Sequence, residues 1–414
     1  MKIIVFLHDL VLGGTTVNSI ELAAALRDLH GHEVVFFATP GPMQQMVLDH
    51  GLRLIPAPVA RTQPSPGRMR ALRQAIRDEK PDLLHVWEIL PCIDAYWGAH
   101  VPLGLPVFVT DMRMQVTRRL PKALHTTFGT PEVLDQAKAA GRKRSLLLLP
   151  PVDTRINSME HTQSDDFRAQ WSVSPEQITL VTVSRLENPM KGESLRRTLQ
   201  AVRSLGHELP LRLLLVGDGA ARSRTAQLAG QVNDHLGREA ITLTGAMRDP
   251  RAAYAAADIV LGMGSSALRA LAYGKPLVVL GERGFAREFT RDTAASFHYT
   301  GFYGIGDGAA SNANLEAAIR ASAGRLGTDG SLGEFSRRFV VESYSLEVVA
   351  RQLSGYFAAA LADPPRVSAW DVLRNAAFNL REQSFRVRAP PPPAMRFLDD
   401  GSRAGGGNES VSLG

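Results

Sequence analysis

Two cationic residues, Arg185 and Lys191, stand six positions apart directly after a β-rich run of the sequence. Pro189 and Gly192 restrict the segment that carries them. Two cations on one such loop can clamp a diphosphate and stabilise it as a leaving group. Two solvated surface charges are an equally good interpretation of this pair when it is taken alone.

A second anion-binding feature is segment 262–276, in which a glycine turn leads from a predicted strand into a predicted helix. Ser265 or Ser266 can cap that helix, and the unpaired N–H groups of its first turn favour an anion. Gly264 allows a phosphate to approach the backbone closely. An ordinary capped helix is the simpler interpretation of this segment alone.

Two further glycine turns follow predicted strands. Gly13 and Gly14 allow a close approach from the opposite domain, although a plain tight turn is an alternative. The turn 217–219 has Arg222 where a dinucleotide fingerprint needs its third glycine, so we predict no NAD site there. We interpret it as a strand-to-helix turn near the cleft.

These loops need strands and helices to hold them. Predicted strands and helices alternate in two consecutive series, the first starting at Lys2 and the second at Ile178. Such alternation is typical of doubly wound parallel sheets, which bind ligands at the carboxyl ends of their strands. We therefore predict an α/β fold in which two Rossmann-like domains face each other across a cleft.

A stiff segment with two prolines, 150–153, separates the two series. We assign residues 1–153 to an N-terminal acceptor-side domain and residues 154–361 to a C-terminal donor-binding domain. A helix over 366–388 is expected to cross back to the first domain. The tail 389–414 has few apolar residues, and we expect it to be disordered.

The composition of the 414 residues excludes several classes of protein. A single cysteine, Cys92, excludes a disulfide scaffold and fits a reducing cytosol. The net charge of +6 is spread along the chain, which argues against a nucleic-acid partner. No apolar run is long enough to span a bilayer, so we expect a soluble or at most peripheral protein, and the single cysteine favours the cytoplasm. A basic amphipathic helix over Arg68–Lys80 suggests peripheral contact with the inner face of the membrane, and a solvated charged helix face is the alternative.

Taken in order, these motifs resemble the family-4 glycosyltransferases of the GT-B fold. The resemblance covers roughly residues 1–361, and it is specific because many weak motifs recur in the family's sequence order. The matching pieces are the Gly13-Gly14 loop, 30–34, Arg185 with Lys191 and Gly192, 215–219, 244–245, 257–259 and 272–276.

The resemblance implies retaining transfer of a sugar from a UDP- or GDP-linked donor to a small-molecule, glycan or lipid acceptor, with no metal ion or other cofactor. It implies that Arg185 and Lys191 bind the donor diphosphate, that Gly264, Ser265 and Ser266 offer it N–H groups, and that residues 245–247 flank the nucleobase. The donor-binding residues that it implies are Gly13, Gly14, Gly217, Gly245, Ala246, Met247, Gly264, Ser265 and Ser266.

One departure from the family lies in the second domain. The family usually carries two glutamates eight positions apart, and Leu261 and Arg269 stand at those places here. A guanidinium only donates hydrogen bonds, so it cannot accept them from ribose hydroxyls. Arg269 therefore pairs with a donor phosphate, meets a carboxylate such as Glu282, or marks a site without activity. Glu282 can also replace the missing acidic residue.

This departure leaves a second function open. A catalytically degenerate GT-B protein that binds a nucleotide, or that partners an active glycosyltransferase, is the alternative to an enzyme. A sugar-nucleotide epimerase is a further alternative, but it needs acidic and histidine side chains around the sugar, and the sequence offers no convincing set.

A second departure lies in the first domain. Family members often place a histidine after the strand that matches 107–110, and Asp111 stands there instead. We predict a catalytic role for Asp111, with His85, Glu88 and Arg113 on the acceptor side. A packed core histidine is the alternative interpretation of His85.

Overall fold

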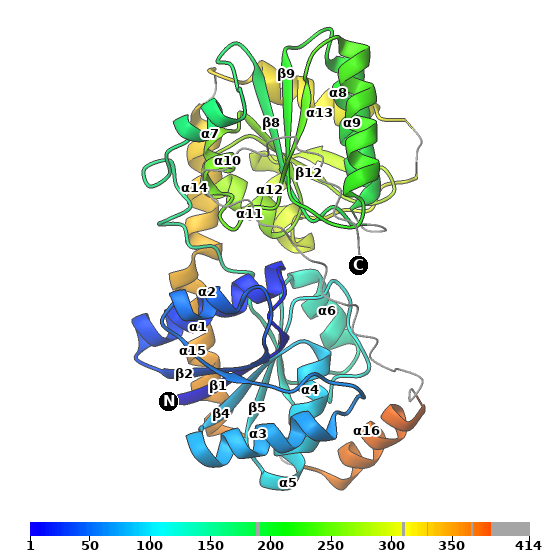
Figure 1. Cartoon of the computed structure of the whole chain (residues 1–414). Coiled ribbons are helices and arrows are strands. Elements are labelled where there is room, and N and C mark those ends of the chain that lie inside the picture. Colours follow the sequence, from blue (N-terminus) through cyan, green and yellow to red (C-terminus); the bar gives the residue numbers. More distant parts are fainter. Residues whose placement is uncertain (188–190, 309–310, 329, 366, 382–414) are drawn as a thin grey trace, which may run out of the picture.

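The computed structural model describes residues 1–187, 191–308, 311–328, 330–365 and 367–381. They form two lobes, each built around one β-sheet (Figure 1). The elements of the N-terminal lobe are β1 (Lys2–Asp9), α1 (Gly14–His30), β2 (Glu33–Thr39), α2 (Gln44–Asp49), β3 (Arg53–Pro56), α3 (Pro66–Glu79), β4 (Leu83–Trp87), α4 (Ile89–Ala95), the π-helix η1 (Tyr96–His100), α5 (Val101–Leu103), β5 (Val107–Asp111), β6 (His125–Phe128), α6 (Pro131–Ala139) and β7 (Ser145–Leu147).

The C-terminal lobe follows in the same alternating manner. Its elements are α7 (Asp165–Gln170), β8 (Ile178–Val183), α8 (Gly192–Leu205), β9 (Leu211–Val216), α9 (Arg222–Leu236), β10 (Ile241–Gly245), α10 (Arg251–Ala256), β11 (Ile259–Gly262), α11 (Ser265–Ala272), β12 (Leu277–Leu280), β13 (Ala286–Glu288), α12 (Arg291–Thr300), α13 (Ala313–Gly324) and α14 (Gly330–Tyr344). Two helices complete the described chain, α15 (Leu346–Ala362) and α16 (Ala369–Arg381).

The N-terminal sheet has seven parallel strands in the order β3-β2-β1-β4-β5-β6-β7. Strand β1 is buried on both faces: Ile3 and Val5 belong to one apolar cluster, and Ile4 and Phe6 belong to another. Helices on both faces explain why this strand reads as a continuous apolar run. The C-terminal sheet has the order β10-β9-β8-β11-β12-β13, and it is parallel except for β13. The predicted fold class is confirmed.

The strand order reverses once in each sheet, between β1 and β4 and between β8 and β11. In open α/β sheets, ligands bind beside the carboxyl ends of the strands at such a reversal. The loops that leave these strand ends carry the Gly13-Gly14 turn after β1, Arg185 after β8 and Gly264 after β11. The topology therefore brings the glycine turns and one of the two predicted cations to the strand ends where a ligand binds.

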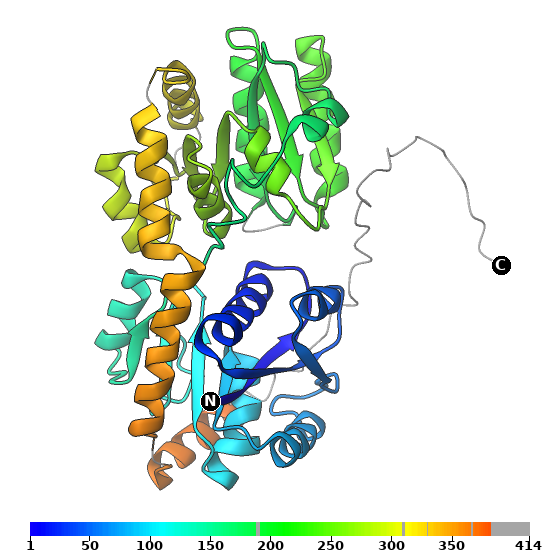
Figure 2. The same cartoon turned by 90° about the vertical axis from the view of Figure 1, so that its left-hand side faces the viewer.

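The chain returns to the N-terminal lobe earlier than the sequence predicts. Helices α14 and α15 run one after the other along both lobes (Figure 2). Tyr344 packs in the core of the C-terminal lobe, whereas Val349 and Phe357 pack in the core of the N-terminal lobe. The assignment of residues 346–361 to the C-terminal domain is therefore wrong, because the apolar face of α15 is buried against α1 and the N-terminal sheet.

Helix α16 also lies beside the N-terminal lobe (Figure 1), where Asn375 Nδ2 donates a hydrogen bond to Tyr96 Oη at 3.4 Å. Residues 382–388 of the predicted crossing helix and the predicted tail 389–414 lie outside the described residues. The two segments that connect the lobes pair with each other, because Val152 N–H donates to the carbonyl of Tyr344 and Leu346 N–H donates to that of Val152.

The predicted membrane-contacting helix corresponds to α3, and one of its basic residues is not on the surface. Arg68 is 1% exposed, and its guanidinium contacts His8 Nδ1 at 2.7 Å and donates to Thr39 Oγ1 at 2.8 Å. Arg68 is therefore excluded from any lipid contact, because these partners hold it inside the lobe. Contact with anionic lipid through the exposed Arg70 and Arg77 stays a prediction. In the described part of the chain, no helix is long and apolar enough to cross a bilayer.

Candidate active site

A cavity of about 620 Å³ lies between the two lobes, and we call it the cleft cavity. Its N-terminal wall comes from the loop before α1, from α1 itself and from the region of α2. Its C-terminal wall comes from the loops that follow β8, β9, β10 and β11. Among the residues that line it are Gly13, Gly14, Glu21, Met43, Gln45, Met46, Asp49, His50, Arg185, Lys191, Gly217, Ala246, Met247, Asp249, Arg251, Ser265, Ser266 and Arg269.

The two predicted diphosphate-binding cations both line the cleft cavity. The Arg185 side chain is 52% exposed, and its nearest carboxylate is Glu187, with 3.5 Å between Nη1 and Oε1. Burial and the neighbouring charge of Arg185 lower the pKa of Lys191 to about 8. Two cations that face one cavity repel each other, so an anion bound between them is favoured and raises the pKa of Lys191 again. The segment 188–190 between them lies outside the described residues.

The start of α11 also faces the cleft cavity, through Ser265 and Ser266. The N–H groups of this first turn have no acceptor within the helix, so they are available to an anion. Gly264 departs from the prediction that its N–H group binds the donor diphosphate. Its N–H already donates to the carbonyl of Phe302 at 2.9 Å, so it does not face an anion. Gly264 instead gives the turn its φ of 58°, a backbone conformation that favours glycine.

Three of the predicted donor-binding glycines have different structural roles. A Cβ atom on Gly14 would lie 3.3 Å from Ser265 Oγ, so the two lobes approach each other closely there. Gly217 has a φ of +147°, and a Cβ on it would lie 1.9 Å from the carbonyl oxygen of Ser184, so this glycine packs two loops together. Gly245 lies outside the cavity lining, and its carbonyl accepts the Gly217 N–H at 2.8 Å.

Arg269 meets a carboxylate, as one of the three alternatives proposes, but the partner is not the predicted one. Its Nη2 atom lies 3.6 Å from Oε1 of Glu21, which belongs to α1 of the opposite lobe. Glu282 lies outside the cavity lining and hydrogen-bonds the Tyr303 side chain. Burial is the main cause that raises the pKa of Tyr303, and the hydrogen bond with Glu282 is the second. Glu282 is therefore not the partner of Arg269, and its contribution to the donor site stays a prediction.

Glu88, Asp111 and Arg113 lie at the carboxyl ends of β4 and β5, whereas His85 is the middle residue of β4. The described lining of the cleft cavity contains none of these four acceptor-side candidates. Asp111 is fully buried, and it accepts hydrogen bonds from Arg113 Nε at 2.7 Å and Nη2 at 2.6 Å. Glu88 accepts a hydrogen bond from Thr15 Oγ1 at 2.9 Å. Burial raises the pKa of Glu88, and the Thr15 bond opposes that shift.

The prediction for His85 is wrong. This side chain is 1% exposed, contacts Thr110 Oγ1 at 2.8 Å and packs against the rings of Trp87 and Phe357. Burial lowers its pKa to about 3, so the imidazole is neutral at physiological pH. The alternative interpretation of a packed core histidine is the correct one, because an acceptor has no access to the ring.

Sequence reasoning missed several cavity residues. Glu21 is one of them. The sequence feature that could have identified it is a carboxylate inside the otherwise apolar stretch 20–26, where an unpaired charge is rare. Asp249 and Arg251 are two others. Burial acts to raise the pKa of Asp249, but hydrogen bonds from Arg251 outweigh it and hold that pKa below its ordinary value. The α2 wall of the cavity had no recognisable motif.

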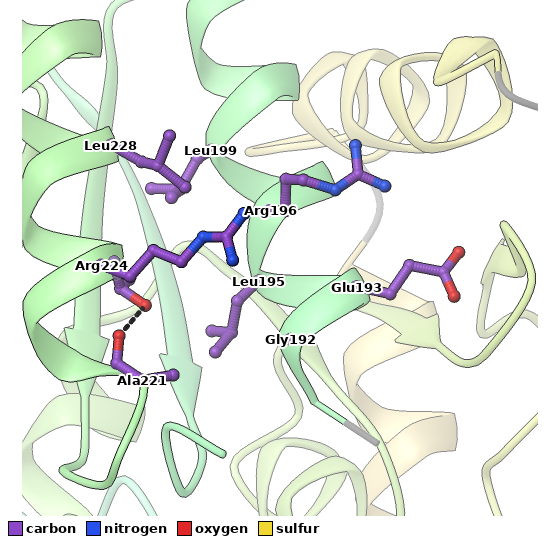
Figure 3. A pocket seen from close by; sticks show the side chains of 9 residues that line it. Gly192, Glu193, Leu195, Arg196, Leu199, Ala221, Arg224 and Leu228 are labelled. Carbon is purple, nitrogen blue, oxygen red and sulfur yellow. Dashed lines mark hydrogen bonds between the residues drawn. The ribbon is translucent and has the colours of Figure 1, made fainter. Parts of the chain in front are cut away.

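A second hollow of about 230 Å³ lies between α8 and α9 (Figure 3). It is lined by apolar side chains such as Leu195 and Leu228 together with Arg196 and Arg224, and it contains none of the predicted site residues. Glu193 points away from the hollow in Figure 3, and its carboxylate accepts the backbone N–H groups of Arg283 and Gly284. The predicted diphosphate-binding residues Arg185, Lys191, Ser265 and Ser266 therefore line the cleft cavity and not this hollow.

Among the described residues, no group of three or more His, Cys, Asp or Glu side chains is placed to hold a metal ion.

Two family models match this chain, one in each lobe. Residues 12–111 match the model described as Glycosyltransferase Family 4. Residues 177–313 match the model described as Glycosyl transferases group 1, and the two matches together span more than half of the chain. The chain belongs to the group 1 glycosyltransferases of family 4. The predicted family is thus confirmed.

This glycosyltransferase is also similar in fold to solved structures. A glycosyltransferase from Rickettsia africae is 16% identical, with a TM-score of 0.69 over 88% of this chain and 99% of that one. HepE of Anabaena in complex with UDP-glucose is 14% identical, with a TM-score of 0.68 over 87% and 100%. Sucrose-phosphate synthase of Thermosynechococcus elongatus is 14% identical, with a TM-score of 0.62 over 87% and 99%. No curated protein matches the glycosyltransferase.

Proposed function

We propose that this glycosyltransferase transfers a sugar from a nucleoside-diphospho-sugar to an acceptor bound by the N-terminal lobe, with retention of the anomeric configuration. One observation carries the proposal: Arg185, Lys191 and the start of α11 face the same cavity between the lobes. Three groups that prefer anions, converging on one space, fit a diphosphate better than they fit an uncharged ligand.

The chemical role of this arrangement follows from the charge that develops on the leaving group. When the bond between the sugar and the diphosphate breaks, negative charge accumulates on the phosphate oxygens. The guanidinium of Arg185 and the ammonium of Lys191 stabilise that charge, together with the N–H groups of Ser265 and Ser266. The proposal assigns this task to the protein's own groups and gives no role to a metal ion or another cofactor.

We assign the nucleobase to the neighbourhood of Ala246 and Met247, which line the same cavity. Apolar side chains with a neighbouring turn backbone suit the face and the edge of a base. HepE of Anabaena, solved in complex with UDP and with UDP-glucose, supports a UDP-linked donor, and a GDP-linked donor has the same diphosphate chemistry. The acceptor, whether a small molecule, a glycan or a lipid, is assigned to the N-terminal wall.

A cytoplasmic location is part of the proposal, and its support is the single cysteine. Cys92 is buried, and burial raises the pKa of its thiol to about 12. A lone, unreactive thiol fits a reducing compartment.

A second candidate function is a degenerate protein that binds a nucleotide without transferring sugar. The observation that favours it is Arg269, which stands where the family usually carries a glutamate and is held by Glu21. The two functions differ in turnover but not in nucleotide binding, so an activity measurement separates them.

The experiment measures binding of UDP, GDP and their sugar conjugates by calorimetry and then hydrolysis of the bound conjugate. We expect the natural protein to bind nucleoside diphosphates and to hydrolyse a bound nucleoside-diphospho-sugar slowly, so that water takes the sugar and the nucleoside diphosphate leaves. We expect Lys191→Ala to weaken binding at least tenfold. Nuclear magnetic resonance of the first product formed then reports its anomeric configuration. Binding without release supports the degenerate protein, and the absence of binding contradicts both functions.

A further inference from the structure

Glu21 has a hydrogen-bonding capacity that the protein does not satisfy. It is 8% exposed, and it lines the cleft cavity from the N-terminal lobe. Oε1 lies 3.6 Å from Arg269 Nη2, and Oε2 is buried and has no hydrogen-bond partner among the described residues. An unsatisfied carboxylate oxygen costs free energy, and native proteins rarely leave one without a purpose.

The carboxylate is suited to accept hydrogen bonds from a ligand. Glu21 is among the residues that line the cleft cavity, so a ligand bound there comes close to its side chain. Burial raises the pKa of Glu21, and the guanidinium of Arg269 opposes that shift and favours the ionised, accepting form. A carboxylate beside a cation attracts hydroxyl and N–H donors and repels phosphate oxygens.

The position of Glu21 indicates which part of the donor it meets. The groups assigned to the diphosphate and the base belong to the C-terminal lobe, whereas Glu21 reaches the same cavity from the opposite side. A nucleoside-diphospho-sugar carries hydroxyl groups in two places: on the ribose between base and diphosphate, and on the sugar beyond the diphosphate. Both sources present the same chemistry to a carboxylate.

We propose that Glu21 accepts a hydrogen bond from a hydroxyl group of the bound donor, so that the N-terminal lobe recognises the donor's sugar hydroxyls and the donor connects the two lobes. Arg269 is then a positioning residue, which holds the Glu21 carboxylate at the cavity wall and does not itself bind the hydroxyl. This inference rests on the proposed function, because it needs a nucleotide in the cleft cavity.

The first part of the experiment changes the ligand and leaves the protein intact. Calorimetry compares UDP with its 2′-deoxy and 3′-deoxy analogues, and it compares UDP with UDP-glucose. If the ribose is the source, one deoxy analogue binds at least tenfold more weakly than UDP, because the buried carboxylate then loses its donor. If the transferred sugar is the source, UDP-glucose binds at least tenfold more tightly than UDP.

The second part tests whether Glu21 is responsible for that discrimination. Glu21→Gln removes the charge of the acceptor, and the double variant Glu21→Gln with Arg269→Gln also removes the uncompensated buried cation. Glu33→Gln, an exposed carboxylate on the same lobe, is the matched control. We expect both cavity variants to reduce the discrimination to less than threefold, the control to retain it, and the double variant to recover the thermal stability that Glu21→Gln loses.

The outcomes separate this inference from the proposed function. If Glu21 merely joins the lobes, the variants lose stability but keep the full discrimination between hydroxyl and deoxy ligands, and the inference is overturned. Binding of UDP without any discrimination in the natural protein also overturns it and leaves the proposed function standing. If neither UDP, GDP nor their conjugates bind, both fail together.

Discussion

The state of Lys191 predicts how donor binding depends on pH. Burial and the charge of Arg185 lower the pKa of this lysine to about 8, so it loses its proton at a pH where most lysines are fully charged. A diphosphate bound beside it stabilises the ammonium form and raises the pKa again. The affinity for UDP is therefore highest below pH 8 and falls as the pH rises above it.

The magnitude follows from the linkage between proton binding and ligand binding. Each pH unit above the pKa of the free protein costs up to a factor of about ten in affinity, as long as the complex stays protonated. From pH 7 to pH 9, this gives a loss of about tenfold. The second ionisation of a phosphate lies near pH 6, so the charge of the ligand itself is nearly constant over this range.

Calorimetric titration of UDP at several pH values between 7 and 9, at constant ionic strength, measures this dependence. Lys191→Arg is expected to bind UDP with an affinity that does not change over this range, because arginine stays charged. Lys138→Met, which alters an exposed lysine on α6, is the control and should behave like the natural protein. A natural protein whose affinity for UDP is equal at pH 7 and pH 9 would refute the reasoning.

The structure makes two further predictions, which concern stability. Gly217→Ala is expected to lower the free energy of unfolding by about 1–3 kcal/mol, because its Cβ would meet the Ser184 carbonyl at 1.9 Å, and a melting temperature equal to that of the natural protein would contradict this. The pKa of His85 is about 3 in the folded protein and near 6.5 in the unfolded chain. Between these values the unfolded chain binds more protons than the folded protein. His85 therefore lowers the free energy of unfolding as the pH falls below 6.5. In urea denaturation, the His85→Phe variant should therefore lose less stability between pH 6.5 and pH 4 than the natural protein, and it should keep full transferase activity. An unchanged dependence of stability on acid, or lost activity in a folded variant, speaks against the buried neutral imidazole.

The parts of the fold that follow local rules could be predicted from the sequence. Apolar runs that end in glycine turns identified the strands, and the alternation with helices identified two parallel sheets. Arg185, Lys191 and the Ser265-Ser266 turn were found for the same reason, because they follow strand ends directly, and strand ends in such sheets meet at the ligand.

The features that depend on distant contacts could not be predicted. Glu21 and Arg269 are 248 positions apart in the chain, and no local pattern connects them. The return of α15 to the N-terminal lobe depends on which core receives Val349 and Phe357, and their helical spacing fits either core. The sequence likewise does not show whether His85 lies in the core or at the surface, because apolar neighbours in sequence are compatible with either position.

A crystal structure of the protein with UDP tests the central claim most directly. We predict that the diphosphate lies in the cleft cavity, with its oxygens within hydrogen-bond distance of Lys191 Nζ and of the N–H groups of Ser265 and Ser266. A diphosphate bound elsewhere, such as beside Arg196 and Arg224 in the hollow between α8 and α9, would contradict it.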